Sequence, residues 1–370
     1  MGDARDIRQG LQIPTVEGGY ADQPFIVVND DGSWLCVVTT GPGEEGAPGQ
    51  HVAALLSEDL GQSWSKPVAL EDPAGPESSY AAPLKTPSGR VYVFYNYNRD
   101  NLREVIADPP YNVTRRVDTQ GAYVYRYSDD GGRTWSKERY EIPVRAFKLD
   151  LTNPYGGEVR FFWSTAMPFI YEGVVYQWLY KVGRFGAGFL VQTEGALLAS
   201  DNLLTEPDPA KHRWQTLPEG DIGVRIPGQL VNEEHSTVVL SDGTFYTVFR
   251  TTHGLAANAI SRDRGHTWQV DWLRYGPGQR VVKHPRAANF IWKCGNGKYV
   301  YWFHNHGGAG TFEGQPDFAP YEGRNPAWIC GGVEQEGTIQ WSQPEVLLYE
   351  RELGVRMSYP CCFGAAGKQF

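Results

Sequence analysis

The chain has 370 residues and a formal net charge of −9, and 13% of its residues are aromatic. The acidic balance argues against a nucleic acid or an anionic membrane as partner, because both require a basic protein surface. No run of about 18 apolar residues indicates a membrane span, and the first ten residues lack the basic and apolar regions of an export signal. We therefore expect a cytoplasmic protein or an exported one whose signal has been removed.

Runs typical of β-hairpins, each with a turn signal in its middle, recur along the chain. They lie at 23–40, 80–98, 164–182, 235–252 and 286–306, and a sixth begins at Tyr359. The 43 glycines and 25 prolines also favour short strands joined by tight turns. Degenerate outer turns follow the third and fifth hairpins, so we interpret each repeat as a unit of four strands.

A phrase of the form Ser-x-Asp-x-Gly-x-Ser/Thr-Trp occurs at 57–64, 128–135 and 261–268. Each copy follows one strand-like run and leads into another, which is typical of a β-turn. The aspartate can accept hydrogen bonds from the turn amides, the glycine can adopt a positive φ, and the tryptophan can pack between units. We therefore assign Asp59, Asp130 and Asp263 to folding rather than to catalysis.

Together the hairpins and turns predict an all-β fold, a β-propeller of six or seven four-stranded blades, in a single domain spanning residues 1–370. The sixth hairpin stops at Phe370, where its second strand is due, so we expect the natural protein to continue. The segment 7–18 is a candidate closing strand. The repeated phrase resembles the Asp box of sialidase-like propellers, a resemblance that implies the fold and not the function, because this scaffold carries many activities.

In a four-stranded meander the start of the first strand and the end of the second strand lie at one edge, so both are expected to rim a central cavity. At these positions the fourth and fifth hairpins concentrate basic and titratable residues: His235, Arg250, His253, His284, Arg286, His304 and His306. We predict that this concentration marks the functional site. A structural role is the alternative, since Arg250 could pair with Glu233 or Glu234. His284, His304 and His306 are candidate ligands of a structural metal ion, although we expect no required cofactor.

Histidine, tyrosine and arginine together suit β-elimination from a uronic acid, which needs a base, an acid and a cation for the carboxylate. The chain resembles propeller lyases that degrade ulvan, gum arabic and arabinogalactan. That resemblance implies His235, His253 and Tyr301 as catalytic residues and Arg324 as a substrate-binding residue. From their expected places at the strand edges, we also predict that Arg250, Arg286, His304 and Tyr359 bind substrate. We predict a polysaccharide lyase whose partner is a uronate-containing oligo- or polysaccharide, releasing rhamnose that caps glucuronate.

Three alternatives stay open. The stretch 21–52 resembles propellers described as α-L-rhamnosidases, which implies a glycoside hydrolase that depends on His51. A sialidase needs an arginine triad, a Tyr/Glu pair and an acid aspartate, but its early Arg-Ile-Pro motif is represented only by Gln12-Ile13-Pro14. The third alternative is a propeller that binds carbohydrate without turning it over.

Overall fold

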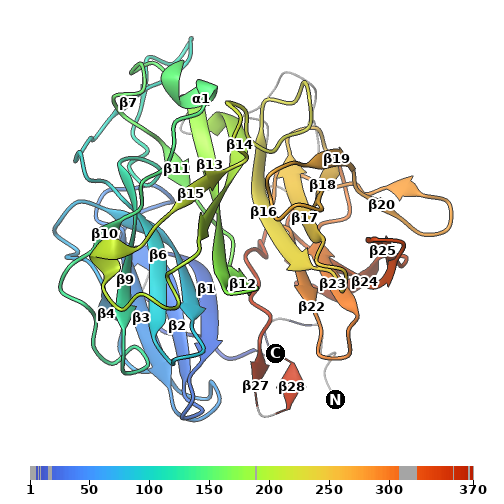
Figure 1. Cartoon of the computed structure of the whole chain (residues 1–370), viewed down its shortest axis with the longest axis horizontal. Coiled ribbons are helices and arrows are strands. Elements are labelled where there is room, and N and C mark those ends of the chain that lie inside the picture. Colours follow the sequence, from blue (N-terminus) through green and yellow to red (C-terminus); the bar gives the residue numbers. More distant parts are fainter. Residues whose placement is uncertain are drawn as a thin grey trace. The chain divides into compact units, whose positions relative to one another are not determined.

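The computed structural model describes residues 6, 8, 10–15, 19–187, 190–307, 323–352, 354–365 and 367–369. Strands dominate these residues (Figure 1), and the helical elements are one turn of α-helix, α1 (Lys148–Leu151), and one turn of 3-10 helix (Pro209–Lys211). No described helix is long and apolar enough to cross a membrane. The all-β prediction is therefore confirmed.

The chain forms two compact units. Unit 1 comprises Met1–Gly10, Leu190–Gly195 and Gly223–Tyr359, and unit 2 comprises Leu11–Phe189, Ala196–Ile222 and Pro360–Phe370. The single domain spanning 1–370 stays a prediction.

Unit 2 begins with two antiparallel sheets of four strands. The first has the order β1-β2-β3-β4, with β1 (Tyr20–Val28), β2 (Trp34–Gly41), β3 (His51–Ser57) and β4 (Val68–Ala69). The second has the order β10-β9-β6-β5, with β5 (Ser78–Lys85), β6 (Val91–Tyr97), β9 (Ala122–Ser128) and β10 (Tyr140–Glu141). In both sheets the strand that begins the hairpin is the edge strand.

A third sheet has the order β11-β13-β14-β15, with β12 paired to β13. Its strands are β11 (Phe162–Trp163), β12 (Phe169–Tyr171), β13 (Val174–Phe185), β14 (Leu190–Ser200) and β15 (Gln215–Leu217). Unit 2 also contains the pairs β7 (Val105–Ile106) with β8 (Val113–Thr114) and β27 (Gly364–Ala365) with β28 (Lys368–Gln369).

Unit 1 contains one sheet of four strands and one of five. One has the order β16-β17-β18-β19, with β16 (Asn232–Val239), β17 (Phe245–Thr251), β18 (Ala256–Ser261) and β19 (Gln269–Trp272). The other has the order β22-β23-β24-β25, with β22 (Phe290–Lys293), β23 (Tyr299–Phe303), β24 (Ala327–Gln335) and β25 (Thr338–Trp341), while β26 (Glu345–Leu348) also pairs with β24. A short pair joins β20 (Arg274–Tyr275) to β21 (Arg280–Val281).

The prediction of six or seven blades is wrong, because the described residues form five sheets of four or five strands. The hairpin that begins at Tyr359 contributes only the two-stranded pair β27-β28. The physical reason is length, since the eleven residues after Tyr359 can form one short hairpin but not four strands. The candidate closing segment 7–18 lies partly outside the described residues, and its described part forms no named strand.

The first strand of three sheets carries a β-bulge at the same point. The register shifts between Asp22 and Phe25 in β1, between Ser79 and Ala82 in β5, and between Glu233 and Ser236 in β16. The first residue inside each bulge has a positive φ, namely 55° at Gln23, 62° at Tyr80 and 56° at Glu234. Such angles are uncommon for residues other than glycine. Because a bulge redirects the side chains around it, these positions can place polar groups where a regular strand could not.

The repeated Asp-containing phrase forms a turn held by its aspartate, as predicted. Asp130 Oδ1 accepts hydrogen bonds from the Thr134 amide and the Ser128 hydroxyl, both at 2.8 Å, and Oδ2 accepts from the Thr134 hydroxyl at 2.6 Å. Asp59 and Asp263 make the same set of bonds in their own turns. Burial alone would raise the pKa of Asp130, but the bonds from Thr134 and Ser128 outweigh it and hold the pKa below its ordinary value.

We predict that Asp130→Ala lowers the free energy of unfolding by about 1–2 kcal/mol at pH 7, because the turn loses three hydrogen bonds at a solvent-exposed site. Since the folded-state pKa is depressed, this contribution is present above the ordinary aspartate pKa of about 3.9 and is lost as the pH falls below it. Urea denaturation of both proteins at pH 7 and pH 3 measures the difference. Asp129→Ala is the matched control, because Asp129 makes only an exposed ion pair with Arg90. Equal losses in the two variants would contradict the assignment.

Candidate active site

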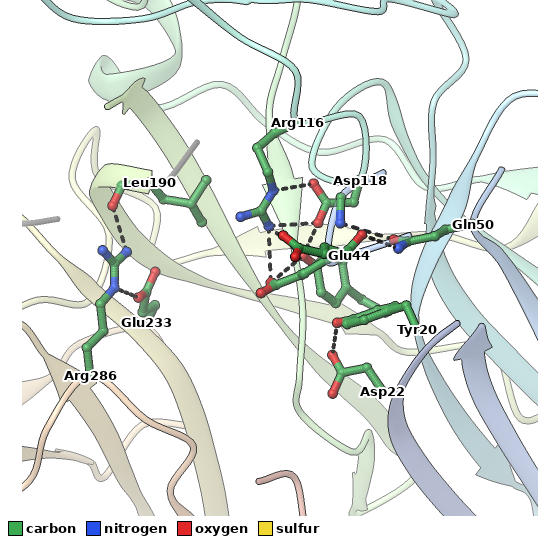
Figure 2. Close-up of polar contacts among 12 residues, drawn as sticks. Tyr20, Asp22, Glu44, Gln50, Arg116, Asp118, Leu190, Glu233 and Arg286 are labelled. Atoms are coloured by element: carbon green, nitrogen blue, oxygen red, sulfur yellow. Dashed lines mark hydrogen bonds and ion pairs between the residues drawn. The ribbon is translucent and has the colours of Figure 1, made fainter. Parts of the chain in front are cut away.

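The site in unit 1 is built around a fully buried carboxylate. Glu233 Oε1 accepts hydrogen bonds from Arg250 Nε at 3.0 Å and from Arg286 Nε at 2.9 Å. Glu233 and Arg250 are direct partners in the β16-β17 ladder, whereas Arg286 comes from the segment just before β22. Figure 2 shows the Arg286 guanidinium reaching both Glu233 and the carbonyl oxygen of Leu190, to which it donates at 2.6 Å. One carboxylate therefore fixes two arginines, one from β17 and one from the segment before β22.

The neighbouring bulge residue makes a second set of contacts. Glu234 Oε1 lies 2.9 Å from Arg250 Nη1 and accepts a hydrogen bond of 2.7 Å from the Tyr359 hydroxyl. Tyr359 has a φ of 51°, close to that of Glu234, and only 9% of its surface is exposed. A tyrosine that donates to a buried carboxylate is the arrangement in which the carboxylate can remove the phenolic proton.

A third arginine lies beside this pair. Arg324 Nη1 donates to Ser358 Oγ at 2.8 Å, and its Nη2 donates to the carbonyl oxygen of Arg286 at 3.2 Å. Among the side chains Glu233, Glu234, Arg250, Arg286 and Arg324, three guanidinium groups therefore accompany two carboxyl groups. This excess of positive charge, on side chains no more than 6% exposed, favours an anionic group of a ligand.

The pKa values of the two adjacent carboxyl groups are shifted in opposite directions. Burial would raise the pKa of Glu233, but the charges of Arg286 and Arg250 outweigh it and lower the pKa below its ordinary value. Burial raises the pKa of Glu234, and the Glu233 charge adds to that effect, while Arg250 and Tyr359 oppose it only in part. Glu233 is thus a permanent anion that holds the arginines, and Glu234 is the carboxyl group suited to exchanging a proton.

The residues predicted to carry β-elimination lie in three different environments. His235 is fully buried, its ring stacks on Phe249 with centroids 4.5 Å apart, and burial lowers its pKa to about 3. His253 is half-buried and stacks on Trp272 at 5.4 Å. Tyr301 lies on β23 inside the apolar core of unit 1, where its hydroxyl reaches Asn289 Oδ1 at 3.4 Å. The catalytic role of these three residues stays a prediction.

His235 also packs closely against the chain on its other side. A Cβ atom placed on Gly195 would come within 2.5 Å of the His235 ring, so only glycine fits there. Both residues belong to unit 1, where Gly195 pairs with Val224 in an isolated bridge. The neutral, tightly enclosed ring of His235 therefore has the environment of a packing residue.

The remaining histidines of the predicted cluster face backbone carbonyls. His304 places its two ring nitrogens 3.0 Å from the carbonyl oxygens of Pro326 and Met357, and burial lowers its pKa to about 4. His284 Nε2 lies 2.9 Å from the carbonyl oxygen of Ala287, and His306 contacts that of Gly323. Within the described ranges no group of three or more His, Cys, Asp or Glu side chains is arranged to hold a metal ion.

Unit 2 contains a separate polar cluster, also drawn in Figure 2. Arg116 Nη2 lies 2.7 Å from Asp118 Oδ2 and 3.2 Å from Glu45 Oε1, and it donates to the Tyr80 hydroxyl at 3.0 Å. Tyr80 is the bulge residue of β5, and its hydroxyl also donates to Asp118. Burial raises the pKa of Tyr80 well above its ordinary value. This cluster is an acidic counterpart to the basic one in unit 1, and the sequence patterns did not reveal it.

The remaining predicted residue in unit 2 is His51, which begins β3. It is half-buried and its Nδ1 lies 3.2 Å from the carbonyl oxygen of Gly49. The loop before it is held by Gln50, whose amide donates to the Glu44 carbonyl at 2.6 Å and accepts from the Gly46 amide at 3.1 Å. A hydrolytic role for His51 stays a prediction.

Comparisons with known proteins agree with this architecture. Residues 126–137 match the BNR/Asp-box repeat. No curated protein matches the chain in sequence. The solved intramolecular trans-sialidase from Ruminococcus gnavus is similar, with a TM-score of 0.59 and 14% identity over 98% of this chain and 91% of that one.

Two further structures are similar at the same level. The NanB sialidase from Streptococcus pneumoniae has a TM-score of 0.60 and 13% identity over 96% of this chain, which spans 66% of the NanB chain. An α-L-arabinanase from Penicillium chrysogenum has a TM-score of 0.53 and 11% identity over 94% of this chain and 85% of that one. At these identities the likeness shows the fold alone, which is a β-propeller.

We predict that Tyr301→Phe changes the free energy of unfolding by no more than about 1 kcal/mol, because the change removes only a long hydrogen bond inside the apolar core. Urea denaturation of the purified variant measures the difference. A loss of several times that size would contradict the weak hydrogen bonding of this hydroxyl.

Proposed function

We propose that the chain is a glycoside hydrolase that removes a carboxylate-bearing sugar, with Tyr359 as the nucleophile and Glu234 as its base. The observation that carries the proposal is the 2.7 Å hydrogen bond from the Tyr359 hydroxyl to Glu234, within a cluster that also contains three arginines. Sialidases are the group of glycosidases known to use a tyrosine in this way.

The chemistry explains why a phenol suits such a substrate. A carboxylate on or beside the anomeric carbon repels an anionic nucleophile, whereas the Tyr359 hydroxyl stays neutral until it reacts. As the Tyr359 oxygen bonds to the anomeric carbon and the glycosidic carbon–oxygen bond breaks, the phenolic proton passes to Glu234. The departing oxygen takes a proton from an acid or from water. Water then attacks the anomeric carbon of the glycosyl-enzyme and breaks its bond to the tyrosine oxygen. Glu234 returns its proton to that oxygen, and the proton lost by the water replaces the one taken up by the departing group.

The arginines supply the complementary charge. Arg250 and Arg286 are held by Glu233, and Arg324 by neutral oxygens, so each guanidinium has a fixed orientation. Guanidinium groups bind carboxylates in a planar, two-pronged geometry that a lysine cannot reproduce. An arginine cluster of this kind would therefore select a carboxylated sugar over a neutral one.

The comparisons support hydrolysis in a general way, since the similar structures include sialidases and an arabinanase by their own names. Elimination from a uronate stays the competing prediction. It would use the same positive cluster for the carboxylate, but its proposed proton-transfer groups His235 and Tyr301 are enclosed by packing. The two reactions give different products, so one assay separates them.

We predict that the wild-type protein releases 4-methylumbelliferone from its glycoside of N-acetylneuraminic acid or of glucuronic acid. Product absorbance near 235 nm should not rise with rhamnosyl-α-1,4-glucuronate, in which the C4 oxygen carries the leaving sugar that elimination requires. Glu234→Gln should lower kcat by about 10²–10⁴-fold, and Tyr359→Phe by at least as much. Tyr301→Phe serves as the matched control, because it removes the same hydroxyl group from a core tyrosine. An increase in absorbance near 235 nm that is also seen with Tyr359→Phe would show that the reaction is elimination and not hydrolysis.

The pH dependence of turnover supplies a second test. Glu234 must be ionised to accept the proton, and burial raises its pKa. The rate should therefore fall as the pH decreases through a value above the ordinary glutamate pKa of about 4.3. We expect the acidic limb of a kcat/KM profile to lie above that value, and to disappear in the residual activity of Glu234→Gln. An acidic limb at or below about 4 in the wild-type protein would argue against Glu234 as the base.

A further inference from the structure

An open cleft in unit 1 lies between β19 and β25, which are the end strands of its two sheets (Figure 1). Its volume is about 530 Å³, within the range of roughly 300–1,000 Å³ that is typical of small-molecule sites. Glu234 and Tyr359 are not among the described residues that line it. The cleft is therefore distinct from the proposed catalytic pair.

One wall of the cleft carries three polar side chains on a single face of a sheet. Across the β18-β19 ladder Asn258 pairs with Asp271, and Ile260 pairs with Gln269. Because ladder partners and residues two apart share a face, Asn258, Asp271 and Gln269 point to the same side. Asp271 and Gln269 are exposed and Asn258 is half-buried, so a ligand can reach them. Arg262 Nη1 donates to Gln269 Oε1 at 3.1 Å, which orients that amide and leaves its N–H₂ group to donate.

The floor of the cleft is formed by core side chains of both sheets. Tyr246 is 2% exposed and Trp341 is 4% exposed, and both belong to the apolar core of unit 1. Trp341 Nε1 donates to the Tyr246 hydroxyl at 3.1 Å, which links β25 to β17 beneath the cleft. The polar wall therefore stands on strands and not on a loop, and its side chains are held in place before a ligand binds.

The backbone edges beside the cleft are already paired where they could accept another strand. The Trp272 amide donates to Asp271 Oδ1 at 2.7 Å, and the Trp341 carbonyl oxygen accepts from the Gly276 amide at 2.9 Å. A peptide that extends a sheet needs such backbone groups to be unpaired. The lining also contains one carboxylate, Asp271, and one guanidinium, Arg274, so neither sign of charge predominates. These features favour an uncharged ligand that is bound by side chains.

We propose that this cleft binds an uncharged, disaccharide-sized part of a glycan at a position separate from the catalytic pair. The Asp271 carboxylate accepts hydrogen bonds from sugar hydroxyls, the Gln269 N–H₂ group donates to a hydroxyl oxygen, and the Asn258 amide does both. Such a mixture of donors and acceptors matches hydroxyl groups, each of which both donates and accepts. The choice of a sugar over another uncharged polar ligand rests on the proposed function, whereas the site itself rests on the cleft and its polar wall.

Asp271→Ala removes the carboxylate of the polar wall and tests the proposal directly. Glu345→Ala is the matched control, because Glu345 is an exposed carboxylate on β26 of the same unit and does not line the cleft. Gln269→Ala is a second variant of the wall. All three changes are at exposed positions, so each Tm should stay within about 2 °C of the wild-type value.

Binding is measured by ligand-observed NMR titration with methyl β-lactoside and methyl β-cellobioside, which are uncharged disaccharides. The wild-type protein should bind at least one of them, and Asp271→Ala should weaken that binding about tenfold, because a hydrogen bond to a charged group is lost. Gln269→Ala should weaken it as well, whereas Glu345→Ala should not change it.

Tyr359→Phe separates this proposal from the proposed function. It should leave disaccharide binding unchanged, so a protein that fails to hydrolyse carboxylated sugars can still bind at the cleft. Failure of the wild-type protein to bind either disaccharide would overturn the proposal. Undiminished binding by Asp271→Ala, or equal weakening in Glu345→Ala, would also overturn it. Loss of binding in Tyr359→Phe would place the disaccharide at the catalytic pair instead.

Discussion

The structure of the unit 1 site depends on one interaction, the shared hydrogen bonding of the Glu233 carboxylate by Arg250 and Arg286. Burying a charge is costly unless a partner compensates it. Here three charged side chains compensate one another, and each residue is at most 2% exposed. Because Glu233 is committed to this role, Glu234 is the carboxyl group left to interact with Tyr359. A structural anion thus leaves its neighbour free to accept the hydrogen bond from Tyr359.

A regular strand could not produce this arrangement, since successive side chains point to opposite faces. Glu233 and Glu234 are consecutive, yet both contact Arg250, at 2.9 Å in each ion pair. The bulge in β16 and the left-handed angle of Glu234 make this geometry possible. The strain of that angle is offset by the hydrogen bond from Tyr359 and the ion pair with Arg250 that the redirected carboxylate gains.

The sequence patterns predicted the repeating hairpins and their turns well, because alternating apolar residues and the Asp-containing phrase report local structure. They predicted too many blades, since the strand-like start at Tyr359 was counted as a blade although only eleven residues of this chain follow it. The patterns named Arg250, Arg286 and Tyr359, and the resemblance to propeller lyases named Arg324; the structure brings these four side chains together. Glu233 and Glu234 were named only as possible ion-pair partners of Arg250, and the catalytic role of Tyr301, which lies in the core, stays a prediction. The bulge could not be predicted from the sequence, because the residue type does not indicate that a glutamate or tyrosine has a positive φ.

The bulge also explains how a fold shared by many enzymes can acquire different chemistry. The backbone geometry at Gln23, Tyr80 and Glu234 is nearly the same, with φ values between 55° and 62°, but the side chains are an amide, a phenol and a carboxylic acid. Each substitution at such a position changes the polar group presented while the ladder on either side keeps its register. The scaffold therefore fixes where functional groups emerge, and the residue type alone decides what they do.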